Sequence, residues 1–201
     1  MRGMSVASNV PEMASELVHR RFSLAEYEAM IKQGILDGDD RVELLAGEIV
    51  KRMVQGERHA SCVARLTRFF VIALGTRAIL LPQGPVALPP DSMPEPDITL
   101  VQEREDFYAT RRPLASDVHL LIEVSDSTLR IDRKIKLPIY ARAGIDEYWI
   151  VNLRDNVVET YTKPEGDGFS ESRIIRGGES VAPLAFPDIM LKVAEVIPYE
   201  R

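Results

Sequence analysis

The 201-residue sequence predicts a mixed α/β fold in which helices flank a central sheet. Residues 57–74 carry apolar side chains at helical spacing, whereas residues 117–124 and 146–153 are short apolar runs of β type. Residues 156–176 hold two more β-type runs separated by a turn, and these runs predict extra antiparallel strands near the end of the chain. Together these observations favour one mixed sheet with helices packed around it.

The domain is expected to begin after a short tail. Residues 1–21 have no clear periodicity and are expected to form a loose tail, which leaves residues 22–201 as a single domain. Ser23 and Glu26 have the spacing of a capping box, so the sequence predicts a helix over residues 24–33.

The next segment predicts a hairpin, a helix and several strands. Residues 41–54 are of β type, and Ala46 and Gly47 interrupt them as a hairpin turn would. The helix over 57–74 follows, because its apolar residues form one stripe. Strands are then expected at 78–82, 85–88, 97–102 and 117–124, with a polar loop at 103–116.

The last third of the chain predicts a helix, three strands and a final short helix. Residues 130–143 look helical, and Pro138 should kink that helix or occupy its first turn. The following strands form an antiparallel meander. The elements after the first helix are expected at 146–153, 156–163 and 169–176 for the strands and at 187–197 for the final helix.

Bulk composition excludes several classes of protein. The longest strongly apolar run, residues 69–74, is far too short to cross a bilayer, and the N-terminus lacks the order of a secretory signal. A single cysteine, Cys62, excludes an intrachain disulfide and a cysteine zinc cluster, so the cytoplasm is the expected location. A net charge of −6 argues against a protein that simply coats nucleic acid, but it is compatible with an enzyme that grips phosphates through metal ions.

Two carboxylates stand out because they lie in apolar strands. Asp97 opens a strand directly behind Pro94 and Pro96, where an acid is either a turn residue or a ligand. Glu123 is embedded in the strand at 117–124, and burial of an unpaired acid is costly. Glu123 is therefore expected to reach an edge, to pair with a cation or to bind a metal.

A basic segment follows the strand of Glu123 and can return a cation to that acid. It is either a solvated surface helix or part of a site, and Asp132 and Lys136 have the i,i+4 spacing of a helical ion pair. Two strand acids with a nearby lysine suit metal-dependent phosphodiester hydrolysis, which needs hard oxygen ligands and a stabilising positive charge. The basic residues are Arg130, Arg133, Lys134, Lys136 and Arg142.

Three strings make the sequence resemble a known family. "PEPDITLV", "HLLIEVSDST" and "DRKIKLPIYARAGIDEYWIVN" are similar to Uma-type restriction endonucleases of the PD-(D/E)XK nuclease superfamily, and the similarity runs roughly from Phe22 to Ile197. The most distinctive string is "YARAGIDEYWIVN". The resemblance implies a restriction endonuclease-like αβββαβ core, which agrees with the order of elements predicted above.

The resemblance also implies roles for individual residues. Asp97 takes the PD position and Glu123 the (D/E) position of the motif, and the backbone carbonyl of Val124 is implied as a further metal ligand. The usual lysine two residues after the glutamate is replaced by Ser125. Lys136 on the following helix matches the family position instead, and Lys134 is its local competitor.

Two further residues and the cofactor follow from the same resemblance. Glu43 is implied as a third acid that binds metal directly or through water, although it could be a solvent-facing hairpin charge. His59 could contact phosphate or carry a proton, or be a polar residue of the first helical turn. The expected cofactor is Mg²⁺ or Mn²⁺, the expected partner is DNA, and a homodimer is expected by analogy.

Three functions from different classes remain open on the sequence. The leading hypothesis is a metal-dependent endodeoxyribonuclease. The missing E-x-K lysine motivates a second, a nuclease-derived DNA-binding or regulatory module without turnover. A glycoside hydrolase that uses Asp97 and Glu123 as acid and base is the third, but an aromatic content of 6% is low for a sugar cleft. Metal dependence separates the first hypothesis from the third, and turnover separates the first from the second.

Overall fold

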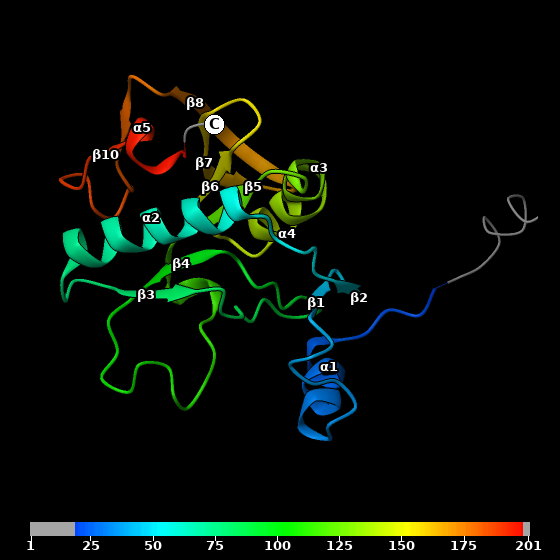
Figure 1. The fold of residues 1–201 in the computed structure, drawn as a ribbon. Coiled ribbons are helices and arrows are strands. Elements are labelled where there is room, and N and C mark those ends of the chain that lie inside the picture. Colours follow the sequence, from blue (N-terminus) through cyan, green and yellow to red (C-terminus); the bar gives the residue numbers. More distant parts are fainter. Residues whose placement is uncertain (1–18, 199–201) are drawn as a thin grey trace, which may run out of the picture.

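The computed structural model describes residues 19–198, and most of the tail predicted at 1–21 lies outside that range. A six-stranded mixed sheet forms the centre of the molecule, in the order β3-β4-β5-β6-β7-β8 (Figure 1). Only β5 and β6 run parallel, and every other neighbouring pair is antiparallel. The strands are β3 (Ile79–Pro82), β4 (Ile98–Val101), β5 (Val118–Ser125), β6 (Glu147–Asn152), β7 (Val157–Glu165) and β8 (Gly168–Arg176).

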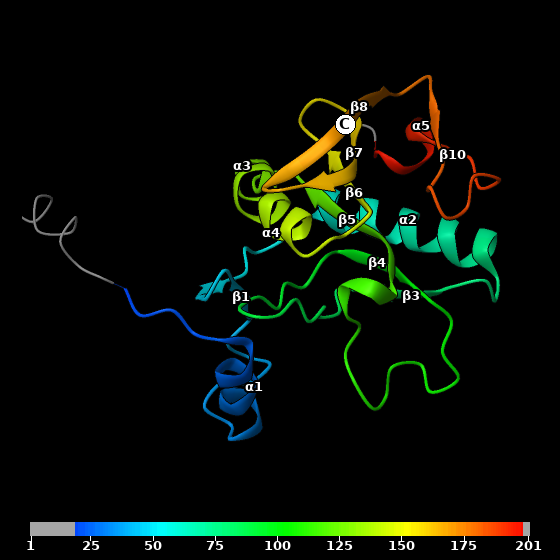
Figure 2. The same ribbon diagram turned by 180° about the vertical axis from the view of Figure 1, so that it is seen from behind.

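Helices cover both faces of this sheet, as a comparison of Figures 1 and 2 shows. Helix α2 (Glu57–Leu74) lies on one face, together with the C-terminal elements β9 (Ser180–Val181), β10 (Leu191–Lys192) and α5 (Val193–Val196). The other face is covered by a helical segment with three parts. These are α3 (Leu129–Ile131), a π-helical turn (Asp132–Lys136) and α4 (Leu137–Arg142).

Alternation along β5 divides the core between the two faces. Leu120 and Ile122 pack with Leu66 of α2, whereas Leu121 packs with Ile139 and its neighbours on the α4 side. Successive side chains of a strand point to opposite faces of the sheet. Because β5 is apolar at nearly every position, both of its faces are buried. The predicted α/β class with an αβββαβ core and extra C-terminal strands is confirmed.

A smaller unit lies beside the main sheet (Figure 1). It contains α1 (Leu24–Lys32) and the hairpin of β1 (Val42–Leu45) and β2 (Glu48–Lys51). The predicted capping box is present, since Ser23 and Glu26 bond to each other's backbone N–H groups. Leu44, buried in β1, packs with this unit and brings the neighbouring Glu43 towards the main sheet.

Two predicted elements were wrong, and one predicted loop ends in a short turn. Residues 85–88 form no strand and make only isolated bridges, because the prolines around them cannot donate to a ladder. A 3₁₀ turn (Ala115–Asp117) ends the predicted loop at 103–116. The final helix was expected over 187–197, but burial alternates from Ile189 to Val193, so this stretch enters β10 before the short α5.

The predicted helix at 130–143 is helical but not uniform. Pro138 lies in the first turn of α4, which is one of the two positions expected for it, directly after the π-helical turn. The π-helical turn before it could not be read from the sequence. Among the described residues, no helix is long and apolar enough to span a membrane.

Candidate active site

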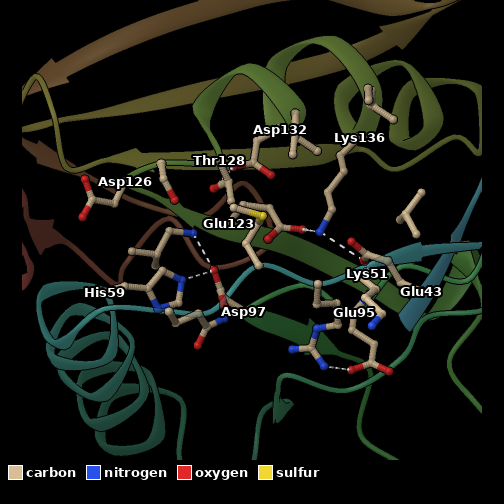
Figure 3. A pocket seen from close by; sticks show the side chains of 18 of the residues that line it. Glu43, Lys51, His59, Glu95, Asp97, Glu123, Asp126, Thr128, Asp132 and Lys136 are labelled. Carbon is tan, nitrogen blue, oxygen red and sulfur yellow. Dashed lines mark hydrogen bonds and ion pairs between the residues drawn. The ribbon is translucent and has the colours of Figure 1, made fainter. Parts of the chain in front are cut away.

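The candidate active site is a pocket at the end of the sheet where β4 begins and β5 finishes. Asp97 directly precedes β4, and the antiparallel pairing of Ile98 with Ile122 places Asp97 opposite Glu123. Opposed residues of antiparallel strands point to the same face. Both acids are 4% exposed and line one pocket of about 190 Å³ (Figure 3). The structure thus brings together the two acids singled out in the sequence.

The carboxylate of Asp97 is held by three groups from different parts of the chain. The Val124 N–H donates to Oδ2 at 2.8 Å, and Nε2 of His59 lies 2.9 Å from the same oxygen. The side-chain amide of Gln55 donates to Oδ1 at 3.1 Å. Asp97 therefore has a fixed orientation, with β5, α2 and the loop before α2 each supplying one partner.

Lys136 lies on the other side of Glu123 and joins two glutamates. Its ammonium donates to Glu123 Oε1 at 3.0 Å and lies 3.2 Å from Glu43 Oε2 (Figure 3). The Tyr140 hydroxyl donates to the same Glu123 oxygen at 2.8 Å. Glu43 also accepts the N–H of Glu95 at 3.1 Å, so the hairpin of β1 and β2 is tied to the site. Glu43 is buried and does not face solvent.

The π-helical turn explains why Lys136, and not Lys134, faces the acids. Lys136 is buried, whereas Lys134 is exposed. Asp132 accepts hydrogen bonds from the hydroxyls of Ser125 at 2.6 Å and Thr128 at 2.7 Å, and the ion pairs of the described residues do not include the predicted Asp132–Lys136 pair. A π turn shifts the i,i+4 alignment of an α-helix. Lys136 is thereby directed to Glu123.

Burial perturbs the charges of this pair. Burial raises the pKa of Glu123 well above its usual value, and the nearby Lys136 charge opposes that rise. Burial also works against a charge on Lys136, but the negative charges of Glu123 and Glu43 outweigh it and raise the lysine pKa. The ammonium therefore stays charged, and ionised Glu123 needs a cation beside it.

The donor chemistry of the pocket fits a hard divalent ion. Asp97 and Glu123 offer carboxylate oxygens, and the Val124 side chain belongs to the core on the α2 face, so only its backbone can face the pocket. Such oxygen donors suit Mg²⁺ or Mn²⁺. Within residues 19–198, no three acidic, histidine or cysteine side chains are gathered as a ready-made metal cluster. The Lys136 ammonium lies between two of the acids, 3.2 Å from Glu43 Oε2 and 3.0 Å from Glu123 Oε1.

The sequence analysis missed several residues of the site. Gln55 and Tyr140 each bond to a site residue, yet neither was singled out for a role, and Asp132, which lines the pocket, was expected only as a helical ion-pair partner of Lys136. Tyr140 and Asp132 stand in the string "DRKIKLPIYARAG" that carried the resemblance, so their place in it was an available signal. Gln55 offered no signal, since its contact with Asp97 crosses 42 positions of the chain.

The basic segment is less exposed to a ligand than its composition suggested. Arg133 pairs with Glu159 and Arg142 pairs with Asp167, while Lys136 is buried against the two glutamates of the site. In the part of the chain that the structure describes, Arg130 and Lys134 are exposed and have no acidic partner. The basic segment therefore adds little positive surface beside the pocket, where Lys51 of β2 is a further lining cation.

A comparison with protein families identifies the chain. The model of the Uma2 family, described as "Putative restriction endonuclease", matches residues 24–194. The protein belongs to the Uma2 family. The predicted resemblance is confirmed, and the match includes every candidate site residue from Glu43 to Lys136.

A solved structure shares the fold of this Uma2 protein. It is described as a putative nuclease belonging to DUF820 from Anabaena variabilis ATCC 29413, and it is similar with a TM-score of 0.70 at 14% identity. The similarity covers 88% of this chain and 97% of the Anabaena chain. A search of curated proteins gave no match. At this identity the likeness establishes the fold, and roles for residues rest on the geometry of the pocket.

Proposed function

We propose that the protein is a divalent-metal-dependent endonuclease that hydrolyses phosphodiester bonds of DNA. One observation carries the proposal: Asp97 and Glu123 face each other across β4 and β5 in one pocket, with the Lys136 ammonium beside Glu123. Membership of a restriction endonuclease family supports the same reading. Two acids and a nearby lysine suit such a hydrolysis, because the acids can bind a hard cation and the lysine supplies a positive charge.

The residues of the pocket have different proposed roles. Asp97, Glu123 and the Val124 carbonyl would hold Mg²⁺ or Mn²⁺, and Glu43 would assist through water. A bound ion of this kind lowers the pKa of its water and offsets charge on the phosphate. Lys136 keeps a positive charge at the edge of the pocket, where it can orient the attacking water or stabilise the developing charge.

His59 orients one of the acids. Its Nε2 contacts Asp97, while its Nδ1 is buried without a hydrogen-bond partner among the described residues. Through this contact His59 would hold the Asp97 carboxylate in place.

The proposal extends to the assembly and the location of the enzyme. A two-fold homodimer would present one pocket to each strand of a duplex, and it is the proposed assembly. The single cysteine, Cys62, is buried and reduced, which is compatible with action in the cytoplasm.

One observation favours a second candidate, a DNA-binding or regulatory module without turnover. Ser125 stands where the usual lysine would be, and its hydroxyl is committed to Asp132. Lys136 is itself held by two glutamates. If those contacts persist with DNA bound, the lysine would not reach an attacking water.

The test is cleavage of supercoiled plasmid and of labelled duplex by the purified protein. We expect nicking with Mg²⁺ or Mn²⁺, none with a chelator, and none with Asp97→Ala. Asp188→Ala is a matched control, because Asp188 is exposed and pairs with Arg77 on the surface. DNA binding without cleavage by the wild-type protein would favour the second candidate, and neither binding nor cleavage would exclude both.

A further inference from the structure

Two glutamines, Gln55 in the pocket wall and Gln83 behind it, form a chain of hydrogen bonds to Asp97. The Gln55 amide donates to Asp97 Oδ1 at 3.1 Å, and its own carbonyl accepts from the side chain of Gln83 at 2.8 Å. The backbone N–H of Gln83 donates to the carbonyl of Asp97 at 3.1 Å. Gln83 therefore holds Asp97 through the main chain and, by way of Gln55, through the side chain.

Gln83 adopts an unusual backbone conformation to make these contacts. Its φ is +50°, in the left-handed region that a side chain other than glycine rarely occupies. Such a conformation costs free energy and persists where the surroundings demand it. Here it directs both the N–H and the side chain of Gln83 back towards the candidate site.

The two oxygens of Asp97 are not equivalent. Each carboxylate oxygen accepts about two hydrogen bonds. Oδ2 already receives the Val124 N–H and the His59 ring, so both of its positions are taken. Oδ1 receives only the Gln55 amide, so one of its lone pairs remains available.

We infer that Gln55, anchored by Gln83, is a positioning residue that makes Oδ1 the single ligand oxygen of Asp97. The Gln55 amide fixes the rotation of the carboxylate and leaves one lone pair of Oδ1 directed into the pocket. This inference rests on the proposed function, since it takes a divalent ion as the ligand. Groups that orient a ligand typically change metal affinity by about 10–100-fold when they are lost.

The first experiment measures Mn²⁺ binding to the full-length protein without DNA, by electron paramagnetic resonance titration. Gln55→Leu keeps the size of the side chain but removes its donor, and it should weaken Mn²⁺ binding about tenfold or more. Gln83→Leu should weaken it in the same direction but less, because Gln83 acts through Gln55. Gln102→Leu is the matched control: that amide donates to the Ser116 carbonyl at the other end of β4, and its loss should leave Mn²⁺ binding unchanged.

Two further readouts separate positioning from a loss of folding. Cleavage by Gln55→Leu should approach the wild-type rate at saturating metal, because its defect lies in metal affinity. A crystal soaked in Mn²⁺ should show Asp97 bound through Oδ1 alone, with Oδ2 still bonded to Val124 and His59. Binding through Oδ2, or through both oxygens, would overturn the inference.

The remaining outcomes are also decisive. If the wild-type protein binds Mn²⁺ and cuts DNA but Gln55→Leu binds Mn²⁺ equally well, the positioning role is wrong while the proposed function stands. If the wild-type protein neither binds Mn²⁺ nor cuts DNA, the proposed function fails and the positioning role fails with it.

Discussion

Two buried glutamates on neighbouring strands, Glu123 of β5 and Glu147 of β6, have opposite surroundings. Both are almost fully buried, and burial raises the pKa of each. Glu123 faces the pocket, where Lys136 and Tyr140 donate to it. Within residues 19–198 no cation contacts Glu147; it accepts the Trp149 indole N–H at 2.7 Å and the Leu184 backbone N–H at 2.6 Å.

The difference shows that burial of an acid does not by itself mark a functional site. Glu147 ties the segment before β10 to the sheet, and its two neutral donors satisfy it. Glu123 has an opposed acid, a buried cation and an open pocket beside it. The surroundings of Glu123 keep charge where a ligand can reach it, whereas Glu147 is a structural tether.

The largest expected effect comes from the matched pair Glu123→Gln and Glu147→Gln. Glu123→Gln removes one proposed metal ligand and should lower the cleavage rate by on the order of 10³-fold, since a metal ion contributes several kcal/mol to the transition state. Glu147→Gln should cut at the wild-type rate at 25 °C. Plasmid nicking under identical metal concentrations measures both, and equal losses in the two variants would break the comparison.

The next effect separates the two lysines of the π-helical turn. Lys136→Ala removes the charge beside Glu123 and should reduce cleavage by roughly 10²-fold, the range for loss of one preorganised charge. Lys134→Ala is the control, because Lys134 is exposed and lies two positions away on the same turn. Thermal unfolding should accompany the assay, since an unpaired buried Glu123 also costs stability. A normal rate in Lys136→Ala would remove this lysine from the site.

A third prediction concerns Glu147 and pH. Burial raises its pKa from 4.5 to about 7 in the folded protein, although its two hydrogen bonds favour the ionised form. Between those pH values the unfolded chain has released a proton that the folded protein still holds, so stability falls as pH rises through this window and levels off above it. The loss is about 3 kcal/mol at most.

Urea unfolding at pH 4, 5.5 and 8 tests this, with Glu147→Gln as the reference that cannot titrate. The wild-type free energy of unfolding, measured relative to the variant, should fall between pH 4 and pH 8. A difference that stays constant with pH would show that Glu147 ionises normally.

The fold could be predicted where one local pattern dominates. The stripe of α2 and the capping box of α1 are properties of neighbouring residues, and both were identified correctly. Residues 85–88 look β-type, but the prolines around them prevent a ladder. The apolar residues at the end of the chain are compatible with both the helical and the strand spacing, and only packing on the sheet selects the β conformation.

The site was predictable in part for the same reason. Asp97 and Glu123 were noticed because acids are rare in apolar strands, and the resemblance added Lys136 and Glu43. The choice between Lys134 and Lys136 depends on a π turn that leaves no pattern in the sequence. The contact of Gln55 with Asp97 exists only because the loop before α2 passes the start of β4. Such long-range contacts are set by the fold and have no local signature.

The smallest expected effect removes one donor from each glutamate. Tyr140→Phe deletes the hydroxyl that bonds to Glu123, and Trp149→Phe deletes the N–H that bonds to Glu147. Each should cost about 1 kcal/mol of stability for the lost hydrogen bond, and Trp149→Phe somewhat more for its smaller ring. Cleavage should fall a few-fold in Tyr140→Phe but not in Trp149→Phe, because only Glu123 belongs to the proposed active site. Urea unfolding and plasmid nicking measure the two quantities separately. A rate loss in Trp149→Phe equal to that in Tyr140→Phe would mean that both glutamates act on activity through the stability of the sheet, and the distinction between site and tether would be lost.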